Sequence, residues 1–271
     1  MTTTALVTDS TSYLPPGLAD ALGITVVSMH VVLDGRSVPE VELDPAEFYR
    51  RLRGGATPTT SQPAPGEFLQ AYDAAGAERV LCVTAAAALS GSHQSALLAA
   101  GMTDLPVDVV DSGTIGGGLC LVVLETARGL AVGASHDEAL ALAQSLGGRV
   151  ASTWSSDTTA LLAAGGRLPN DVPEGIAVFA LDGGQVRVLG AARSVEESID
   201  FQVDVIRASA AQSPTHVTVG HGDAAELADA LVEALSGVDG VLGIDRYVAG
   251  PVVAAHVGAG NVGASYLRAA D

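Results

Sequence analysis

The chain has 271 residues, of which 48% are hydrophobic and 4% aromatic, so it can bury a core as one large or two smaller globular domains. Its 31 acidic and 13 basic residues give a formal net charge of −18, which would repel the backbone of a nucleic acid. Every basic residue is an arginine, and the absence of lysine excludes Schiff-base enzymes, phosphate-loop ATPases and Ser-Lys hydrolases.

Cysteine usage and hydropathy bear on metal binding and location. Cys82 and Cys120 each lie in an apolar run, which predicts buried free thiols rather than a disulfide or a metal pair, and we expect no metal site. The N-terminus lacks the features of a signal peptide, and no stretch reaches the ~18 consecutive apolar residues of a membrane span. We therefore expect a cytoplasmic protein with no stable membrane insertion and at most transient contact with a membrane surface.

The first half of the chain alternates predicted strands and helices. The apolar run at residues 5–7 ends in Thr8-Asp9-Ser10-Thr11-Ser12, which predicts a buried strand followed by a polar loop. One strand is expected over residues 24–33, before a hairpin turn at Asp34-Gly35. Further strands are expected over 80–83 and 107–111, and helices after Pro15 and over 44–52, 65 onward, 92–100, 115–132 and 135–147. This alternation predicts a parallel sheet.

From Arg149 onward the predicted strands follow one another more closely. Strands over 176–181 and 185–189 are joined by Asp182-Gly183-Gly184, which is typical of a β-hairpin, and a long helix is expected over 194–211. The other expected elements are strands over 216–219, 241–244 and 252–256 and a helix over 224–235. This pattern predicts a mixed sheet, and we place a domain boundary between residues 1–149 and 150–271.

Two segments rich in hydroxyl groups lie just before predicted helices. In Pro58-Thr59-Thr60-Ser61-Gln62-Pro63 the prolines favour an extended loop, in which three hydroxyls would form a row of donors. Leu89-Ser90-Gly91-Ser92 lies at a strand-to-helix turn, where hydroxyls and free backbone amides meet the positive end of a helix. Both segments are compatible with simple helix caps, and together they indicate a site for an anion or a carboxylate.

Residues 256–263 contain the G-x-G-x-x-G spacing of dinucleotide-binding loops. Too few residues follow Gly263 to complete a βαβ unit, so we interpret the segment as a strand that ends at His256 before a tight turn, which would point His256 into a cleft. Arg167 and Arg193 either pair with nearby acids or bind an anion. Because catalytic triads are defined by geometry, an esterase or thioesterase that uses Ser90 or Ser92 with His256 is the alternative to a binding protein.

Several motifs follow one another along the whole chain: Thr8-Asp9-Ser10-Thr11, Pro58-Thr59-Thr60-Ser61-Gln62-Pro63, Leu89-Ser90-Gly91-Ser92, Gly165-Gly166-Arg167 and Gly250-Pro251 through His256. This set resembles the motifs of the DegV family of bacterial fatty-acid-binding proteins. The chain departs from that family in Ala85-Ala86-Ala87-Ala88, which replaces a serine pair, and in a shorter segment after Arg167.

The resemblance implies two α/β domains: an N-terminal three-layer domain around a parallel sheet and a C-terminal two-layer domain around a mixed sheet. A long-chain fatty acid would lie between or within them, with no cofactor. Its tail would lie in a tunnel, whose lining we expect from residues 24–32 and 115–130. A separate ATP-dependent fatty acid kinase would phosphorylate the bound acid, so the chain would be a carrier subunit and not itself an enzyme. The residues implied for the carboxylate are Thr60 and Ser90, with Thr59, Ser61, Gly91, Ser92 and His256, and those implied for the acyl phosphate and kinase docking are Arg167 and Arg193.

Overall fold

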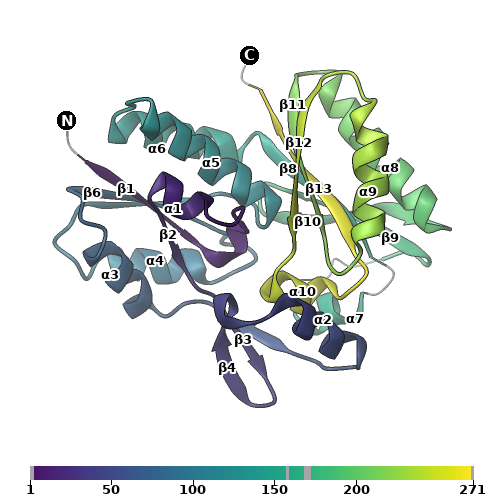
Figure 1. Ribbon diagram of the computed structural model, residues 1–271, viewed down its shortest axis with the longest axis horizontal. Helices are drawn as coiled ribbons and strands as arrows, with labels where there is room; N and C mark the ends of the chain where they lie inside the picture. The colour runs from purple at the N-terminus through teal and green to yellow at the C-terminus, as the bar shows by residue number, and fades with distance from the viewer. Residues whose placement is uncertain (1–2, 157–158, 168–171, 270–271) are drawn as a thin grey trace.

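The computed structural model describes residues 3–156, 159–167 and 172–269, and these fold around two main sheets (Figure 1). The first sheet has four parallel strands in the order β2-β1-β6-β7. Its elements are β1 (Thr4–Asp9), β2 (Ile24–Val27), β6 (Arg79–Thr84), β7 (Val107–Asp111), α3 (Pro65–Asp73), α4 (Ser92–Ala100), α5 (Gly117–Ala131) and α6 (His136–Gly147).

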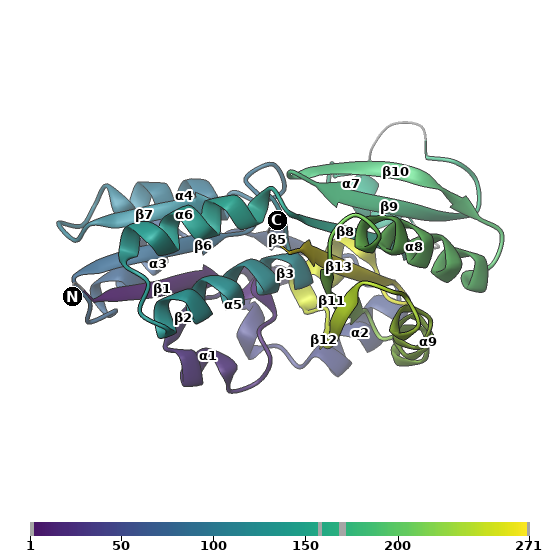
Figure 2. The same ribbon diagram turned by 90° about the horizontal axis from the view of Figure 1, so that it is seen from above.

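Alternation of side chains along these strands gives the first sheet two buried faces. Leu6 and Leu81 pack in the core that contains Leu119 of α5, whereas Val7 and Cys82 pack on the opposite face, in the core formed with α3 and α4. Helices therefore cover both faces: in Figure 1, α5 and α6 lie above the strands and α3 and α4 below them, and Figure 2 looks down onto the α5 and α6 side. The predicted parallel, three-layer arrangement is confirmed.

The strand expected over residues 24–33 is wrong in extent, because the chain leaves the first sheet after Val27. The Met29 amide donates to the Ser10 hydroxyl (3.0 Å), and the Met29 carbonyl accepts from the Glu40 amide (2.7 Å). These bonds turn the chain into a separate three-stranded antiparallel sheet in the order β4-β3-β5. Its strands are β3 (His30–Leu33), β4 (Arg36–Pro39) and β5 (Thr59–Ser61).

The hairpin predicted at Asp34-Gly35 is confirmed. Leu33 pairs with Arg36, and both turn residues have positive φ angles, 51° for Asp34 and 73° for Gly35. Those angles match the twist that a two-residue hairpin requires.

The second main sheet is mixed, as predicted, with the strand order β10-β9-β8-β13-β11-β12. Only β11 and β12 pair in parallel among its described neighbours. Helices α8 and α9 pack on one face, where Ile206 and Leu231 are fully buried. The bounds are β8 (Val150–Ser156), β9 (Ile176–Asp182), β10 (Gln185–Ala192), β11 (Thr215–His221), β12 (Val241–Val248), β13 (Val262–Arg268), α8 (Val195–Ala210) and α9 (Ala225–Ser236).

The strand predicted over residues 252–256 is wrong, because this segment is the helix α10 (Pro251–Val257). Pro251 occupies the first helical turn, where its missing N–H costs nothing. The Val252 amide at the same end donates to the carboxylate of Glu40 (2.8 Å), which lies far away in the sequence. The last strand of the second sheet is instead β13, which the sequence analysis did not predict.

The two halves of the chain share packing. Phe48 and Tyr49 of α2 (Pro45–Arg53) are buried against Val252 and Ala255 of α10, and the Tyr49 hydroxyl donates to the Ala249 carbonyl (2.7 Å). The boundary proposed after residue 149 falls between α6 and β8. The remaining elements are α1 (Leu18–Leu22), α2 (Pro45–Arg53), α7 (Ala160–Ala164) and the short 3₁₀ helices η1 (Ser10–Ser12) and η2 (Glu40–Glu42).

The structure also bears on the cysteines and on membrane-spanning helices. Cys82 and Cys120 are buried free thiols, as predicted, and burial raises the pKa of each to about 12. In the part of the chain that the structure describes, every helix falls short of the length and apolar character needed to cross a membrane.

Candidate functional site

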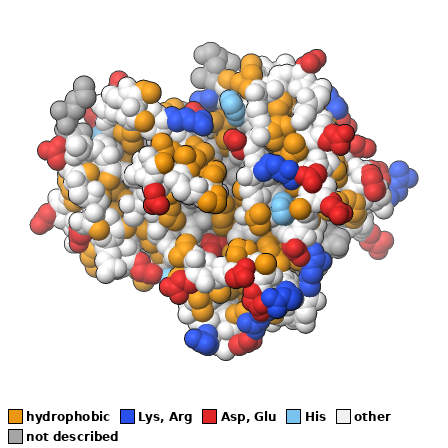
Figure 3. Space-filling view, in the orientation of Figure 1, with side chains coloured by type: hydrophobic (Ala, Val, Ile, Leu, Met, Phe, Trp, Pro, Cys, Tyr) orange, Lys and Arg blue, Asp and Glu red, His pale blue; other side chains and the backbone are white. Residues whose placement is uncertain are grey.

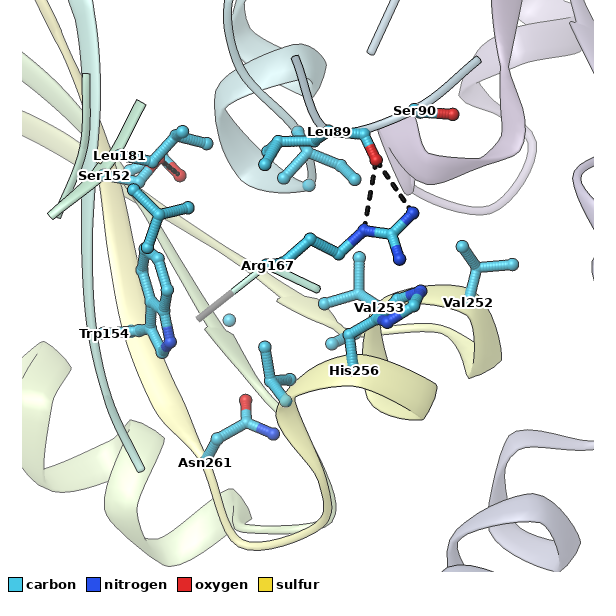
Figure 4. Close-up of a pocket in the computed structure, with 18 of the residues that line it drawn as sticks. Leu89, Ser90, Ser152, Trp154, Arg167, Leu181, Val252, Val253, His256 and Asn261 are labelled. Atoms are coloured by element: carbon cyan, nitrogen blue, oxygen red, sulfur yellow. Dashed lines mark hydrogen bonds between the residues drawn. The ribbon is translucent and has the colours of Figure 1, made fainter. Parts of the chain in front are cut away.

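A cavity lies between the inner face of the second main sheet and the segments that cross over from the first half (Figure 4). The space free of protein atoms is about 1110 Å³, part of it open to solvent. The sheet contributes Ser152, Trp154, Leu181, Ala264 and Ser265 to the walls, and α10 contributes Val252, Val253, His256 and Val257.

The sequence predicted that residues 24–32 and 115–130 line the cavity. This prediction is wrong for most residues of the two segments, because they do not reach the cavity. Met29 and Ile115 do line the cavity, but α5 side chains such as Leu119 are buried in the core between α5 and the first sheet. Gly118 offers no room for a larger residue either, since a Cβ there would clash with Thr114 Oγ1. Most of the cavity wall belongs to the second half of the chain.

The three hydroxyls of residues 59–61 are separated by the geometry of a strand. Because β5 is extended, Thr60 points to one side and its two neighbours to the other. Thr60 lines the cavity, whereas Thr59 and Ser61 are exposed. Thr60 is therefore the one hydroxyl of this segment that the structure brings to the cavity.

The loop before α4 supplies a second pair of hydroxyls. Ser90 and Gly91 line the cavity, and Ser92 is fully buried directly behind them. The Ser90 and Ser92 oxygens are 3.0 Å apart, and the Ser92 hydroxyl donates to the thioether of Met29 (2.9 Å). Since a thioether is a weak acceptor, these hydroxyls can turn to a better acceptor at little cost.

His256 and Arg167 complete this end of the cavity. Thr60 Oγ1 and His256 Nε2 are 2.8 Å apart, and burial, aided by the nearby Arg167 charge, lowers the pKa of His256 to about 4. Arg167 crosses the cavity to donate from Nε and Nη2 to the Leu89 carbonyl, at 3.2 and 3.1 Å (Figure 4). His256 is therefore neutral near pH 7, and Arg167 fixes the loop that carries Ser90. We call Thr60, Ser90, Ser92, Arg167 and His256 the hydroxyl end of the cavity.

The cavity differs in charge from the rest of the molecule. Its described lining includes Arg167 and His256 but no aspartate or glutamate. Acidic side chains instead spread over the outer surface, as Figure 3 shows for one face. An anion could enter this cavity without meeting a like charge.

Arg193 lies apart from this cluster. Its side chain is 92% exposed before α8 and pairs with Glu197, with Nε 3.1 Å from Oε2. The sequence left open whether Arg193 pairs with a nearby acid or binds an anion, and here it pairs with an acid. Because the side chain is exposed, Arg193 could contact a partner protein only on the outer surface. The shorter segment after Arg167 lies partly at residues 168–171, outside the described residues.

No catalytic triad forms among these side chains in the described part of the chain. The Ser90 hydroxyl bonds to Ser92 rather than to His256, and His256 Nε2 is engaged by Thr60. A nucleophilic serine needs a base within hydrogen-bond reach, so the arrangement favours binding over hydrolysis.

The sequence pattern that defines the DegV family, described as a family of uncharacterised proteins, matches residues 3–269. The chain belongs to the DegV family. A DegV domain-containing protein from Streptomyces coelicolor is 31% identical over 270 residues, which cover 96% of each chain.

Solved structures of DegV proteins share the fold. A DegV family protein from Thermus thermophilus, described as binding fatty acid, has a TM-score of 0.92 and 31% identity, covering 98% of this chain and all of its own. A DegV lipid-binding protein from Thermotoga maritima has a TM-score of 0.88 and 26% identity, covering 98% of both chains. The resemblance and the fold class inferred from the sequence are thus confirmed.

The first motif, residues 8–11, lies outside the cavity and supports it. Asp9 is fully buried and accepts from the Ala85 amide (2.8 Å) and the Thr11 amide (3.1 Å), tying together the ends of β1 and β6. Glu40 accepts from the hydroxyls of Ser10 and Tyr13, in addition to the Val252 amide at the start of α10. The DegV motif at β1 therefore anchors the helix that carries His256.

Sequence reasoning missed several residues of the site. Met29 and Asn261 line the cavity without any local motif that would mark them, and Glu40 acts from a helical turn remote from α10. Trp154 had a signal, because it is the single tryptophan of the chain. A second cleft, lined by Tyr13, Glu40 and Val248, opens between the halves on the face of Figure 3, where apolar side chains gather.

Proposed function

We propose that this DegV protein binds a long-chain fatty acid in the cavity, with the carboxylate at the hydroxyl end and the tail along the second sheet. One observation carries the proposal: the cavity has largely apolar walls, Arg167 lies at the hydroxyl end beside Thr60 and Ser90, and acidic side chains are absent from its described lining. The Thermus and Thermotoga relatives, described as fatty-acid-binding and lipid-binding proteins, support the same ligand class.

The residues at the hydroxyl end suit a carboxylate. A carboxylate taken out of water must be hydrogen-bonded, and bonds from neutral donors to a charged acceptor stabilise it by about 1.5–3 kcal/mol each. Thr60 and Ser90 supply hydroxyl donors that now bond only to His256, Ser92 and Met29. The Gly91 backbone approaches the same point, and Thr59 and Ser61 hold the strand that presents Thr60.

We infer that the bound acid is presented to a separate fatty acid kinase, which transfers the γ-phosphoryl group of ATP to the carboxylate and leaves ADP. The chain has no lysine and no phosphate loop for ATP, which supports a carrier role with no cofactor beyond the bound acid. Arg167, inside the cavity, and Arg193, on the outer surface, are the cations we assign to the acyl phosphate and to kinase docking, because a guanidinium engages two phosphate oxygens at once.

Native mass spectrometry of the purified protein tests the binding proposal. We expect one fatty acid per chain, identified after extraction, or uptake of one equivalent of added oleic acid by delipidated protein. A protein that carries no acid and takes up none would contradict the proposal. Turnover of a p-nitrophenyl ester that is lost in Ser90→Ala would instead establish the hydrolase alternative.

A further inference from the structure

The end of the cavity opposite the hydroxyl end carries polar groups that a plain hydrocarbon tail would leave unpaired. Figure 4 shows Ser152 and Trp154 on one side of the cavity and Ser90 and His256 on the other, with Arg167 between them. The indole Nε1 of Trp154 is buried and has no hydrogen-bond partner among the described protein atoms. Ser152 and Ser265, both buried, line the same region. We call Ser152, Trp154 and Ser265 the sheet end.

Ser152 and Ser265 together have one hydroxyl proton that no hydrogen bond between them uses. They face each other across β8 and β13, and their hydroxyl oxygens are 2.8 Å apart. Each hydroxyl has one proton, and one proton suffices for the bond between them, so the second O–H is available. With the Trp154 N–H, the sheet end offers two donors. Asn261 adds an acceptor to the cavity, since its amide nitrogen donates to the Gly258 carbonyl while its side-chain oxygen has no partner among the described residues.

Packing alone does not account for an indole at this position. The Trp154 ring stacks on Phe179, with centroids 5.2 Å apart and an interplanar angle of 20°. Gly263 lies opposite Trp154 in the sheet, and a Cβ at Gly263 would come within 2.5 Å of Trp154 Cβ. A phenylalanine would stack in the same way without burying an unpaired N–H, which is unfavourable in an apolar wall.

We propose, on the basis of the proposed function, that the fatty acid accepted by this cavity bears an oxygen substituent on its chain, as in a hydroxylated fatty acid. The substituent oxygen accepts a hydrogen bond from Trp154 Nε1 or from the free hydroxyl of the Ser152–Ser265 pair. A hydroxyl suits the cavity better than a ketone, because its own proton can be donated to the Asn261 side-chain oxygen. The sheet end thus selects among acyl chains, and the hydroxyl end holds the carboxylate that they share.

Competition binding with delipidated protein tests this selection. The probes are stearic acid, 10-hydroxystearic acid and 12-hydroxystearic acid, which share chain length and carboxylate. We expect at least one hydroxystearic acid to bind about fivefold more tightly than stearic acid, which corresponds to about 1 kcal/mol. In Trp154→Phe that preference should fall to about twofold or less, with the affinity for stearic acid unchanged. If Trp154→Phe is unstable, the double variant Ser152→Ala/Ser265→Ala replaces it. This variant keeps the indole and removes both hydroxyls of the pair, so it should reduce the preference.

The outcomes separate this inference from the proposed function. If the wild-type protein binds none of the three acids, the proposed function fails. If it binds stearic acid as tightly as both hydroxystearic acids, the protein is a fatty acid carrier but the inference is overturned. If Trp154→Phe weakens binding of stearic acid as much as that of the hydroxystearic acids, Trp154 contacts the chain or the carboxylate generally, and the inference is again overturned.

Discussion

Residues 8–12 and the hydroxyl end of the cavity are both rich in hydroxyl groups, but they differ in what those groups and their neighbours bond to. In the first, Asp9 and Glu40 bond to neighbouring hydroxyls and amides, and burial raises the pKa of both carboxyl groups. In the second, the Ser90 hydroxyl contacts only Ser92 and a thioether in addition to the cavity. The two carboxylates accept their hydrogen bonds within the protein, although the buried Thr8 hydroxyl has no partner among the described residues. At the hydroxyl end, Ser90 can exchange weak partners for a ligand.

Hydrogen-bond pairing, more than residue type, therefore separates a structural cluster from a binding site in this molecule. Changes in residues 8–12 should lower stability, because they leave buried amides unpaired. Changes at the hydroxyl end should reduce ligand binding and leave the fold intact.

Asp9→Ala should lower the free energy of unfolding by about 3 kcal/mol, because the buried amides of Thr11 and Ala85 lose their acceptor. Urea unfolding of the delipidated protein measures the change. Asp111→Ala is the matched control: Asp111 also ends a strand of the first sheet and accepts from backbone amides, but it is exposed. It should cost less than about 1 kcal/mol. If both variants lose the same free energy of unfolding, the buried hydrogen bonds of Asp9 do not stabilise the fold more than the exposed ones of Asp111.

The lowered pKa of His256 gives the second prediction, a pH dependence of stability. An unfolded histidine titrates near pH 6.5, whereas burial beside Arg167 holds the pKa of His256 at about 4 in the fold. Acid therefore protonates the unfolded chain first, and stability present above about pH 6.5 is lost as the pH falls toward 4.

Urea titrations from pH 7 to 4 on the wild type and His256→Gln isolate this contribution from that of the carboxyl groups. The wild type should lose on the order of 3 kcal/mol more than the variant over this range. If the free energy of unfolding depends on pH in the same way in both proteins, His256 is not held neutral by the fold.

Arg193→Ala is expected to have the smallest effect on the protein itself. Because the Arg193 side chain is 92% exposed, stability and fatty acid load should stay within error of the wild type. Acyl-phosphate formation with the cognate kinase should fall about tenfold if Arg193 docks the kinase, which corresponds to about 1.4 kcal/mol. Arg207→Ala, which removes an exposed, ion-paired arginine from α8, is the control. If acyl-phosphate formation is unchanged in Arg193→Ala, Arg193 does not dock the kinase and only forms its ion pair with Glu197.

Local patterns predicted the first sheet well and the elements around the cavity poorly. The strands of the first sheet are apolar runs ended by turn residues, and those signals are contained in the runs themselves. The segment 252–256 has two adjacent valines and resembles a strand, but Pro251 and the Glu40 carboxylate make it helical, and Glu40 could not be connected with α10 from the sequence.

The site was predicted in composition more than in geometry. Thr60, Ser90, Arg167 and His256, which come from separate motifs, do line one cavity, and their roles toward a carboxylate or a phosphate stay predictions. The expected row of three hydroxyls at 59–61 does not form, because a strand alternates its side chains and pairing of β5 with β3 could not be predicted. Trp154 was overlooked because β8 and its pairing with β13 were not predicted either.

The account depends most directly on Thr60 and Ser90 holding the carboxylate. The decisive measurement is the fatty acid load, by native mass spectrometry, of Thr60→Val/Ser90→Ala beside the matched control Thr59→Val/Ser61→Ala, whose side chains lie at exposed positions. We expect the first variant to lose its ligand, with affinity reduced by well over tenfold and thermal unfolding unchanged, and the control to keep a full load. A full load in Thr60→Val/Ser90→Ala would show that the carboxylate is held elsewhere and would contradict the account.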